Sequence, residues 1–237
     1  PTQDMILGSY YLTHPGVEER NTYAEKGDGK VFTDLDEMLM AYQNGTVGIH
    51  AKVKVRMFLD GDERGRLVES TVGRFIFNQG IPQDLGFVDR AADPYSLEVD
   101  FLCDKKKLGL IIDKCYRVHG NTGTVIMLDY IKSMGYKYST RAAMTVSISD
   151  MTVPPQKPEM LAEAQATVDK ITRNFKRGLI TDEERYKEVV DTWKKTDDAL
   201  TKALLDGLDK YNNIFMMADS GARGSDKQIK QLAGMRG

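Results

Sequence analysis

The sequence has few of the residues from which proteins build covalent or metal-bound frameworks. Two cysteines and three histidines occur among 237 residues. Cys103 and Cys115 are too few and too far apart to indicate a disulfide framework or a zinc-binding pattern. We interpret both as buried thiols of a protein from a reducing compartment, and we expect a cytoplasmic location.

The chain also lacks a long apolar run and a dominant charge. No uninterrupted apolar stretch approaches the ~20 residues of a membrane-spanning helix, so we expect no membrane contact. The formal net charge is -2, which excludes a global basic field for nucleic acid but leaves room for a local basic patch. Apolar residues make up 41% and charged residues 29%, as is typical of a globular protein.

Both ends of the sequence look like cut points. The chain begins at Pro1 without a methionine and ends at Gly237 directly after a helical pattern. We therefore expect an internal piece of a longer protein, whose chemistry lies partly outside this chain. The length suffices for one large domain or two small ones with cores of their own.

The N-terminal half of the chain mixes helical and strand-like patterns, which predicts an α+β fold. Residues 1–12 alternate only loosely between apolar and polar side chains. Residues 33–44 predict a short helix, with Thr33 as its N-cap and Gly45 at its end. The strict alternation that follows, in 48–59, predicts a strand with one buried and one wet face.

The next segments predict short elements up to a proline boundary. Residues 71–82 predict a short helix. Amphipathic helices are expected at 105–118 and 124–134, separated by Gly120-Asn121 and ended by Gly135. The run 144–153 is β-like, and Pro154-Pro155 then marks a boundary.

Residues 159–208 carry the clearest pattern, two heptad seams joined by a short turn. The seam residues are Leu161, Ala164, Val168, Ile171 and Phe175, then Tyr186, Val189, Trp193, Thr196, Leu200 and Ala203. Gly178 suits a helix end, and Thr181 with Glu184 predicts a capping box. So short a connection makes the helices antiparallel, which predicts a projecting hairpin. Its charged tip either only caps and solvates the helices or docks a partner.

Acidic and histidine side chains give weak signals for a catalytic or metal site. Asp60, Asp62 and Glu63 resemble a magnesium cluster, but the Asp-Gly step between two β-like runs favours a hairpin turn. No metal-ligand spacing links the three histidines. We therefore assign no catalytic residue and no metal site within this chain.

The stretch 220–231, SGARGSDKQIKQ, is a better candidate. Ser225 is predicted as an N-cap with Gln228 in a variant capping box. Gly221 and Gly224 allow the backbone to approach a ligand closely, and Arg223 precedes a helix N-terminus. Together these features favour contact with a phosphate or triphosphate. The alternative is an ordinary turn between a loop and a helix.

The same stretch, read as IFMMADSGARGSDKQIKQLAGMRG, resembles the β′ subunit family of bacterial DNA-directed RNA polymerases. The resemblance recurs in PTQDMILGSYYLT, IHAKVKVR, STVGRFIFN and GLITDEERYKEVVDTW, so it covers nearly the whole chain. It implies a nucleotidyltransferase that transcribes DNA into RNA from nucleoside triphosphates.

The resemblance also implies a location within such a subunit. Residues 1–153 would form a mixed pore domain, and 154–237 a funnel domain with a rim coiled coil at 159–208. The helix at 225–233 would start near the active site. This segment would line the secondary channel, by which nucleotides enter and backtracked RNA leaves. The family's catalytic aspartate loop, bridge helix and trigger loop lie outside this sequence, and so do its Mg²⁺ and Zn²⁺ ligands. We therefore expect the isolated chain to be inactive.

Family positions can be carried over residue by residue. Arg223 matches an arginine near the incoming triphosphate, and Met217 and Gln3 match positions close to the active centre. The factor-facing part of the rim corresponds to Glu184, Arg185 and Tyr186, and the acidic start of the second hairpin helix adds Asp182 and Glu183 to the predicted rim. The resemblance implies as partners the remainder of β′, β and the other core subunits, cleavage and regulatory factors of the Gre and DksA type, and the RNA 3′ end.

The sequence departs from the family at its alarmone pockets. Thr122 and Ser133 replace a lysine and a tyrosine of the first pocket, so that only Asp129 remains. Lys187 and Glu188 depart likewise at the second pocket, and we predict neither. Two further readings stay open: an interaction module without substrate contact and, more remotely, a stand-alone hydrolase.

Overall fold

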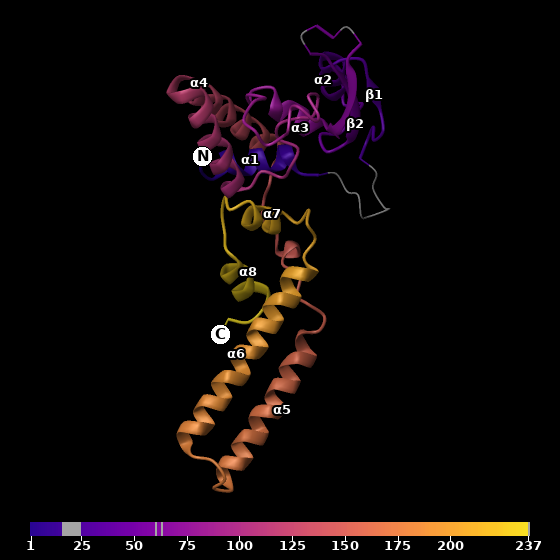
Figure 1. Cartoon of the computed structure of the whole chain (residues 1–237). Coiled ribbons are helices and arrows are strands. Elements are labelled where there is room, and N and C mark those ends of the chain that lie inside the picture. The colour runs from indigo at the N-terminus through magenta and orange to yellow at the C-terminus, as the bar shows by residue number, and fades with distance from the viewer. Residues whose placement is uncertain (16–24, 60, 63, 237) are drawn as a thin grey trace. The chain divides into compact units, whose positions relative to one another are not determined.

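The computed structural model describes residues 1–15, 25–59, 61–62 and 64–236, and it divides into two units. The first unit holds Pro1–Met144 together with the short segment Asp219–Ala222. The second holds Thr145–Ala218 and the residues from Arg223 onward. Helices dominate both units and a small sheet lies in the first, which confirms the α+β class (Figure 1).

The sheet of the first unit has three strands in the order β1, β2, β3. β1 (Val31–Phe32) pairs parallel with β2 (Lys52–Met57), and β2 pairs antiparallel with β3 (Arg66–Thr71). Along β2, Val53 and Val55 are buried, while Lys52 and Lys54, which alternate with them, are exposed. The alternation within 48–59 therefore predicted this strand correctly, and β3 returns antiparallel beside it.

Helix α1 (Asp4–Thr13) was not predicted. Its small and polar residues Gly8, Ser9 and Thr13 are buried along with its apolar ones. Since nearly every face is covered, the sequence has no 3.6-residue apolar stripe to reveal the helix. The buried hydroxyls are satisfied locally, because Ser9 donates to Met5 O at 2.8 Å and Thr13 to Ser9 O at 2.8 Å.

Helices α2 (Leu35–Gln43) and α3 (Val72–Asn78) confirm two short predicted helices. The predicted cap of α2 is wrong by one residue. Asp34, not Thr33, is the N-cap, and its side chain accepts from Glu37 N at 2.7 Å. Glu37 reaches back to the Thr33 backbone N at 2.7 Å, so Thr33 contributes to the cap from the position just before it.

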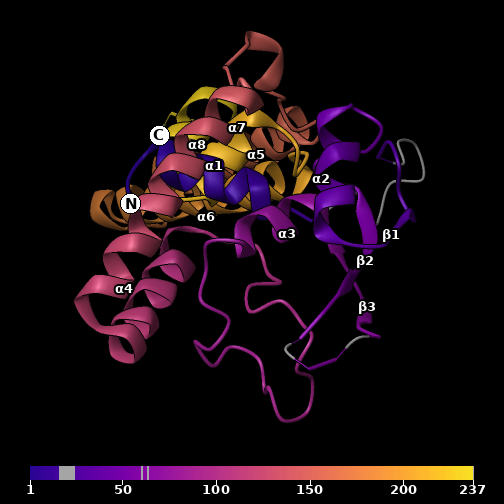
Figure 2. The ribbon, with the colours of Figure 1, turned by 90° about the horizontal axis from the view of Figure 1, so that it is seen from above.

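Helix α4 (Lys105–Ala142) contains the predicted break. Gly120 has φ 64° and ψ -161°, which only glycine adopts readily, and the helix changes direction there (Figure 2). The predicted end at Gly135 is wrong, since the helix continues to Ala142. Gly135 instead lies where α4 crosses α1: a Cβ at Gly8 would come 1.9 Å from Gly135 O.

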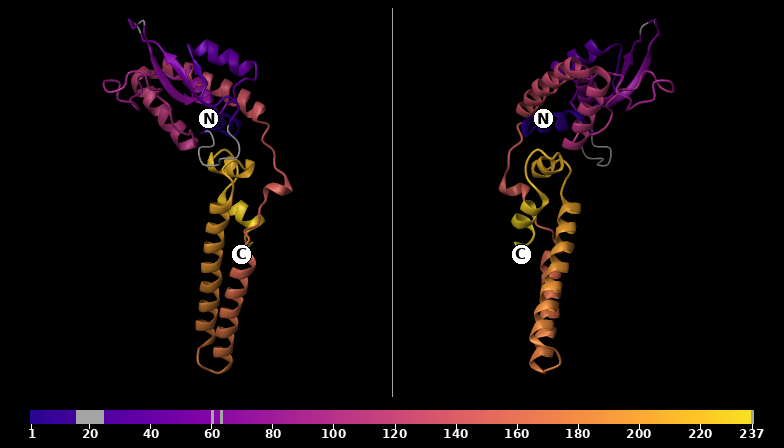
Figure 3. Two further views of the ribbon diagram at one scale, coloured as in Figure 1. Left: turned by 90° about the vertical axis from the view of Figure 1, so that its right-hand side faces the viewer. Right: turned by 60° about the vertical axis from the view of Figure 1, so that its left-hand side comes forward.

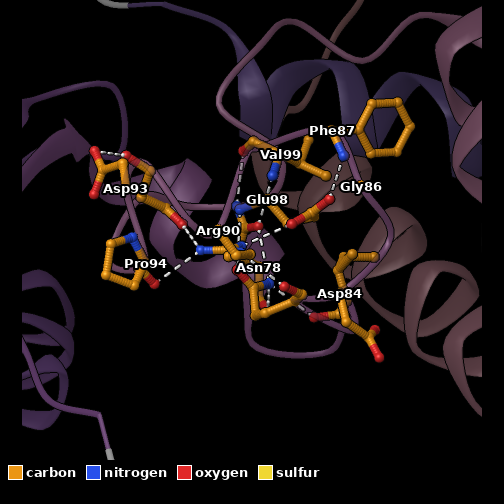
Figure 4. A network of polar contacts seen from close by, with 12 residues as sticks. Asn78, Asp84, Gly86, Phe87, Arg90, Asp93, Pro94, Glu98 and Val99 are labelled. Carbon is orange, nitrogen blue, oxygen red and sulfur yellow. Dashed lines mark hydrogen bonds and ion pairs between the residues drawn. The ribbon is translucent and has the colours of Figure 1, made fainter.

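The segment between α3 and α4, residues 79–104, has no helix or strand and is ordered by a polar network (Figure 4). The Glu98 carboxylate, fully buried, accepts from Phe87 N at 2.6 Å and from Arg90 at 2.7 Å. Arg90 also donates to the carbonyls of Gln83 and Pro94. Asn78 donates to Val99 O at 2.8 Å and accepts from Val99 N at 2.9 Å.

The predicted strand at 144–153 is wrong. This segment is irregular and contains one short 3₁₀ turn, η1 (Ile148–Asp150). Ser147 and Asp150 form a reciprocal capping box, with Ser147 N donating to Asp150 at 2.7 Å. Local side-chain bonds of this kind compete with strand pairing, and the apolar residues that suggested a strand, Val146, Ile148 and Val153, are exposed.

The second unit contains a helical hairpin formed by α5 (Lys157–Lys176) and α6 (Asp182–Gly207), which run antiparallel side by side (Figure 3). The connection has the predicted capping box between Thr181 and Glu184. The seam is buried at Ala164, Ile171, Leu200 and Leu204. Toward the tip the seam is open to solvent: Phe175 is 38% and Tyr186 67% exposed. The predicted seam position of Tyr186 is therefore wrong.

Two further helices complete the chain, α7 (Asn213–Asp219) and α8 (Asp226–Ala233). A small apolar cluster joins them to the base of the hairpin. Its buried members are Leu204, Leu208, Ile214, Ile229 and Ala233. The second unit thus has its own core, separate from the larger core of the first.

Candidate functional site

The predicted phosphate-contacting stretch, 220–231, comprises the connection between α7 and α8 and the first part of α8. Met217 lies near the end of α7, and Arg223 N donates to Met217 O at 3.2 Å. The structure therefore brings together two of the three residues predicted near substrate. Arg223 is exposed, and no ion pair involves its guanidinium within the described ranges. Such a side chain is available for an external anion.

The backbone on either side of Arg223 takes conformations that favour glycine. Gly221 has φ 71° and Gly224 has φ 89°. Ser225 is the N-cap residue of α8, as predicted, but its side chain makes no capping bond, so the predicted capping box with Gln228 is wrong. Gln228 N instead donates to the Ser225 carbonyl at 2.9 Å, which leaves the Ser225 hydroxyl outside the cap.

The small residues just before Arg223 belong to the first unit. The Tyr10 hydroxyl of α1 donates to Asp219 at 2.7 Å, and Lys105 N donates to Ser220 O at 3.0 Å. A Cβ at Gly221 would lie 3.2 Å from Lys105 Cβ. Burial, then the bond to Asp219, raises the pKa of Tyr10 well above its ordinary value, so this hydroxyl stays protonated.

Gln3, the third residue predicted near substrate, occupies the N-cap position of α1 in the first unit. Its φ of 44° and ψ of -115°, with Met5 N donating to Thr2 O at 3.1 Å, are those of the first central position of a type II′ turn. Glycine is favoured at that position, so a glutamine there stores backbone strain. Its side chain is exposed.

The hairpin tip contains the five predicted rim residues. Some of them form ordered contacts within the tip, and others are exposed to solvent. Arg185 donates to Asp182 at 2.9 and 2.7 Å and lies 5.2 Å from the Phe175 ring centroid. Glu184 accepts from Thr181, and those hydrogen bonds lower the pKa of Glu184. Glu183 and Tyr186 are exposed to solvent. Phe175, which the heptad pattern assigned to the seam, is a further tip residue.

Two histidines that seemed unrelated in sequence lie together in the first unit. The rings of His14 and His50 are 5.7 Å apart, and Tyr11 packs edge-on against His50 at 4.6 Å. Burial, and next the neighbouring His14, lower the pKa of His50 to about 4. No local sequence pattern could have predicted this pair, because the two histidines are far apart in sequence and come together only when the chain folds. His119 lies apart, 2.6 Å from Asp84.

The chain matches two family models in succession. Residues 1–151 match the model described as RNA polymerase Rpb1, domain 3, and residues 180–237 match RNA polymerase Rpb1, domain 4. The chain belongs to the RNA polymerase Rpb1/β′ family. Gln3 falls in the first matched range, and the hairpin tip from Asp182 on, Met217 and Arg223 fall in the second.

Curated relatives of this Rpb1-family chain carry the name DNA-directed RNA polymerase subunit beta'. The protein of Alkaliphilus metalliredigens is 60% identical over 237 residues, and that of Clostridioides difficile is 59% identical over 237 residues. Each alignment covers 100% of this chain and 20% of the relative. The chain thus spans about a fifth of the length of the curated relatives it matches.

The described residues of this Rpb1-family chain contain no group of three or more histidine, cysteine or acidic side chains placed to hold a metal ion. Asp60 and Glu63 of the acidic motif lie outside the described residues. Asp62 is engaged in the hairpin, where it accepts from Arg64 N at 2.9 Å and from the Tyr95 hydroxyl. Within the described ranges, no helix combines the length and apolar character needed to cross a bilayer.

Proposed function

We propose that this chain is a segment of the β′ subunit of a DNA-dependent RNA polymerase, a nucleotidyltransferase that makes RNA from nucleoside triphosphates on a DNA template. The match to the family along the chain and the names of its relatives support this proposal. We assign 1–153 to the wall of a secondary channel, and 154–237 to a funnel with a projecting rim. Magnesium-dependent bond formation belongs to residues outside this chain, which is inactive alone.

Arg223 carries the proposed substrate contact. Its guanidinium is exposed and has two glycines as close neighbours in sequence, so a large anion has room to approach. The start of α8 follows within a few residues, and the positive end of a helix favours the same anion. Arginine binds phosphate oxygens through two parallel N–H groups. We assign Arg223 to the triphosphate of the incoming nucleotide, with Met217 beside it. Gln3, in the other unit, is assigned to the vicinity of the active centre by the family resemblance alone.

The test is single-nucleotide addition by an assembled polymerase that carries Arg223→Ala. We expect the apparent KM for nucleotides to rise by about 10- to 100-fold, since a charge-assisted bond to phosphate contributes roughly 1.5–3 kcal/mol. Arg223→Lys should recover some of the loss, because it keeps the charge without the paired donors. Lys227→Ala is the matched control, since Lys227 is an exposed cation at the start of α8. An unchanged KM for Arg223→Ala rejects this role.

A second function, docking of a protein factor of the Gre or DksA type, is favoured by the geometry of the hairpin tip. The exposed phenol of Tyr186 and the carboxylate of Glu183 lie beside a pair, Asp182 and Arg185, that is already ordered. Pre-ordered charges and an exposed aromatic ring suit a protein interface, because few side chains must be immobilised on binding.

The tip contacts decide which variants test docking. Charge reversal at Asp182 or Glu184 would also remove the Arg185 pair or the helix cap. Glu183→Lys and Tyr186→Ala leave both intact, and each should weaken binding of a Gre-type factor about tenfold or more. Glu163→Lys makes the same charge change on the exposed surface of α5, near the base, and should bind normally. Equal binding by all three variants and the parent chain would refute docking at the tip.

A further inference from the structure

The second unit contains a polar contact that the proposed function does not use. Lys230 of α8 forms an ion pair with Asp197 of α6, 33 positions earlier in the chain. The two side chains are only 25% and 16% exposed, so the pair is shielded from solvent far more than the ion pairs at the hairpin tip or on α4. Shielding strengthens the attraction between the charges and reduces screening by salt.

The carboxylate of Asp197 depends on this lysine. Its Oδ2 atom meets Lys230 Nζ, while its Oδ1 atom is buried and has no hydrogen-bond partner among the described residues. If Lys230 is removed, a shielded negative charge loses its counter-ion, which costs more than removing both charges together. The pair is therefore an energetic constraint on how α8 lies against α6.

The apolar cluster alone does not fully fix the same arrangement. Leu204 and Leu208, at the end of α6, pack with Ile229 and Ala233 of α8. Apolar contacts are not directional, so on their own they tolerate sliding and rotation of a two-turn helix. Asp197 lies about two turns before Leu204 on α6, so the ion pair adds a second, directional attachment point.

We propose that Asp197 and Lys230 are positioning residues: their ion pair fixes the orientation of α8 on the hairpin helix α6 and thereby the position of Arg223. Arg223 is two residues before the N-cap of α8 and is bonded through its backbone to Met217 of α7. An α8 that rotates on α6 therefore displaces the guanidinium. The effect on nucleotide use rests on the function proposed for Arg223, whereas the effect on α8 does not.

The effect on α8 is tested on the 237-residue chain by amide hydrogen exchange. We expect Lys230→Met to speed exchange in residues 229–233 by about fivefold or more, because it leaves the more buried Asp197 carboxylate without its counter-ion. Asp197→Asn should have a smaller effect, because the remaining lysine is the more exposed of the two and its long side chain can reach solvent. Lys227→Met and Asp198→Asn are the matched controls, since each changes the same kind of side chain at an exposed position of the same helix. Exchange near the hairpin tip, residues 176–184, should not change.

Reversal of the pair separates attraction from packing. Asp197→Lys with Lys230→Asp should return the exchange of α8 toward that of the parent chain, whereas a role in general packing predicts that the double variant is worse than either single one. Unchanged exchange in Lys230→Met, or an equal change in the two controls, overturns the proposal.

The effect on nucleotide use is measured in an assembled polymerase with Arg223→Ala as reference. We expect Lys230→Met to raise the apparent KM for nucleotides about two- to fivefold with kcat nearly kept, and Lys230→Arg to restore it. If Arg223→Ala raises KM but Lys230→Met does not, the positioning proposal fails while the proposed function stands. If Arg223→Ala leaves KM unchanged, the proposed function fails, and hydrogen exchange alone decides whether the pair orients α8.

Discussion

The Tyr10 hydroxyl lies 2.7 Å from the Asp219 carboxylate, although 209 positions separate the two residues. Tyr10 is buried in α1, and Asp219 opens the short segment that precedes Arg223. The phenol donates to a charged acceptor, which makes this bond stronger than one between neutral groups. The start of the chain therefore restrains the backbone just before the proposed substrate-contacting arginine.

Replacement of Tyr10 by phenylalanine removes only this bond and should reduce stability. We expect the free energy of unfolding to fall by about 1.5–3 kcal/mol, the range for a bond to a charged group, as measured by urea denaturation. Tyr116→Phe is the control, because Tyr116 is a mostly exposed tyrosine of α4. If both variants lose the same stability, the Tyr10–Asp219 bond has no special contribution.

The crossing of α1 and α4 should not tolerate side chains at its two glycines. A Cβ at Gly8 would come 1.9 Å from Gly135 O, and a Cβ at Gly135 would come 2.7 Å from Met5 Cα. Both obstacles are backbone atoms, so the helices must separate. We expect Gly8→Ala and Gly135→Ala each to cost about 2–4 kcal/mol of stability by thermal or urea unfolding.

Gly109 provides the matched control for the crossing. It also lies within α4, but a Cβ there would meet no atom within 4 Å. Gly109→Ala should therefore stabilise the chain by about 0.5–1 kcal/mol, because alanine is the better helix former. A loss of stability at Gly109 as large as that at Gly135 would mean that an added methyl group destabilises α4 wherever it is placed, and that the close crossing is not the cause.

The helical hairpin and strand β2 could be predicted because each has one buried and one solvent-exposed face. Such a face gives a regular apolar pattern in the sequence, with heptad spacing in the helices and strict alternation in the strand. Helix α1 was not predicted and the strand predicted at 144–153 is wrong, for opposite reasons. Most of α1 is buried, so it has no polar face. The 144–153 segment has an alternating pattern, but Val146, Ile148 and Val153 are exposed and its turn is set by Ser147 and Asp150.

The candidate site was predictable only where its residues are neighbours in sequence. Arg223 and its glycines stand together in the chain, and the family resemblance added Met217 and Gln3. Contacts between distant positions left no local sign: Tyr10 with Asp219, Asp197 with Lys230, and His14 with His50. Each depends on which helices pack together, and a single sequence does not report that packing.

His50 should make the stability of the chain fall with acid. Its pKa is lowered from 6.5 to about 4 by burial and by His14, so the folded state resists a proton that the unfolded state accepts. The contribution of neutral His50 to the free energy of unfolding is therefore fully present above pH 6.5 and is lost as the pH falls toward 4. Urea denaturation at several pH values should show this slope.

Substitution of His50 by phenylalanine keeps an aromatic ring against Tyr11 and removes the titrating group. We expect the slope between pH 6.5 and 4 to become shallower in His50→Phe. His119→Gln is the control, since His119 is partly exposed and lies in α4 just before the kink at Gly120. A parent-like slope in His50→Phe would show that other groups set the acid sensitivity.

The buried ion pair of Arg90 and Glu98 should control the order of residues 79–104. Glu98 is fully buried, and Arg90 supplies its counter-charge at 2.7 Å (Figure 4). Arg90→Met leaves that carboxylate without its counter-charge, with only the Phe87 N–H among the described residues still donating to it, which costs about 3–5 kcal/mol. Glu98→Gln retains the shape and should cost less. We expect urea denaturation to rank the variants in this order, with faster proteolytic cleavage within 83–98 in Arg90→Met.

The exposed pair of Arg66 and Asp93 gives the comparison for this last prediction. Its atoms are 3.4 Å apart and both side chains are well exposed, so Arg66→Met should cost no more than about 1 kcal/mol. The two arginines each pair with one carboxylate of the same irregular segment, but Arg90 also donates to the carbonyls of Gln83 and Pro94, so the contrast measures the whole buried network. If Arg66→Met and Arg90→Met destabilise the chain equally, the buried network of Figure 4 does not hold the segment.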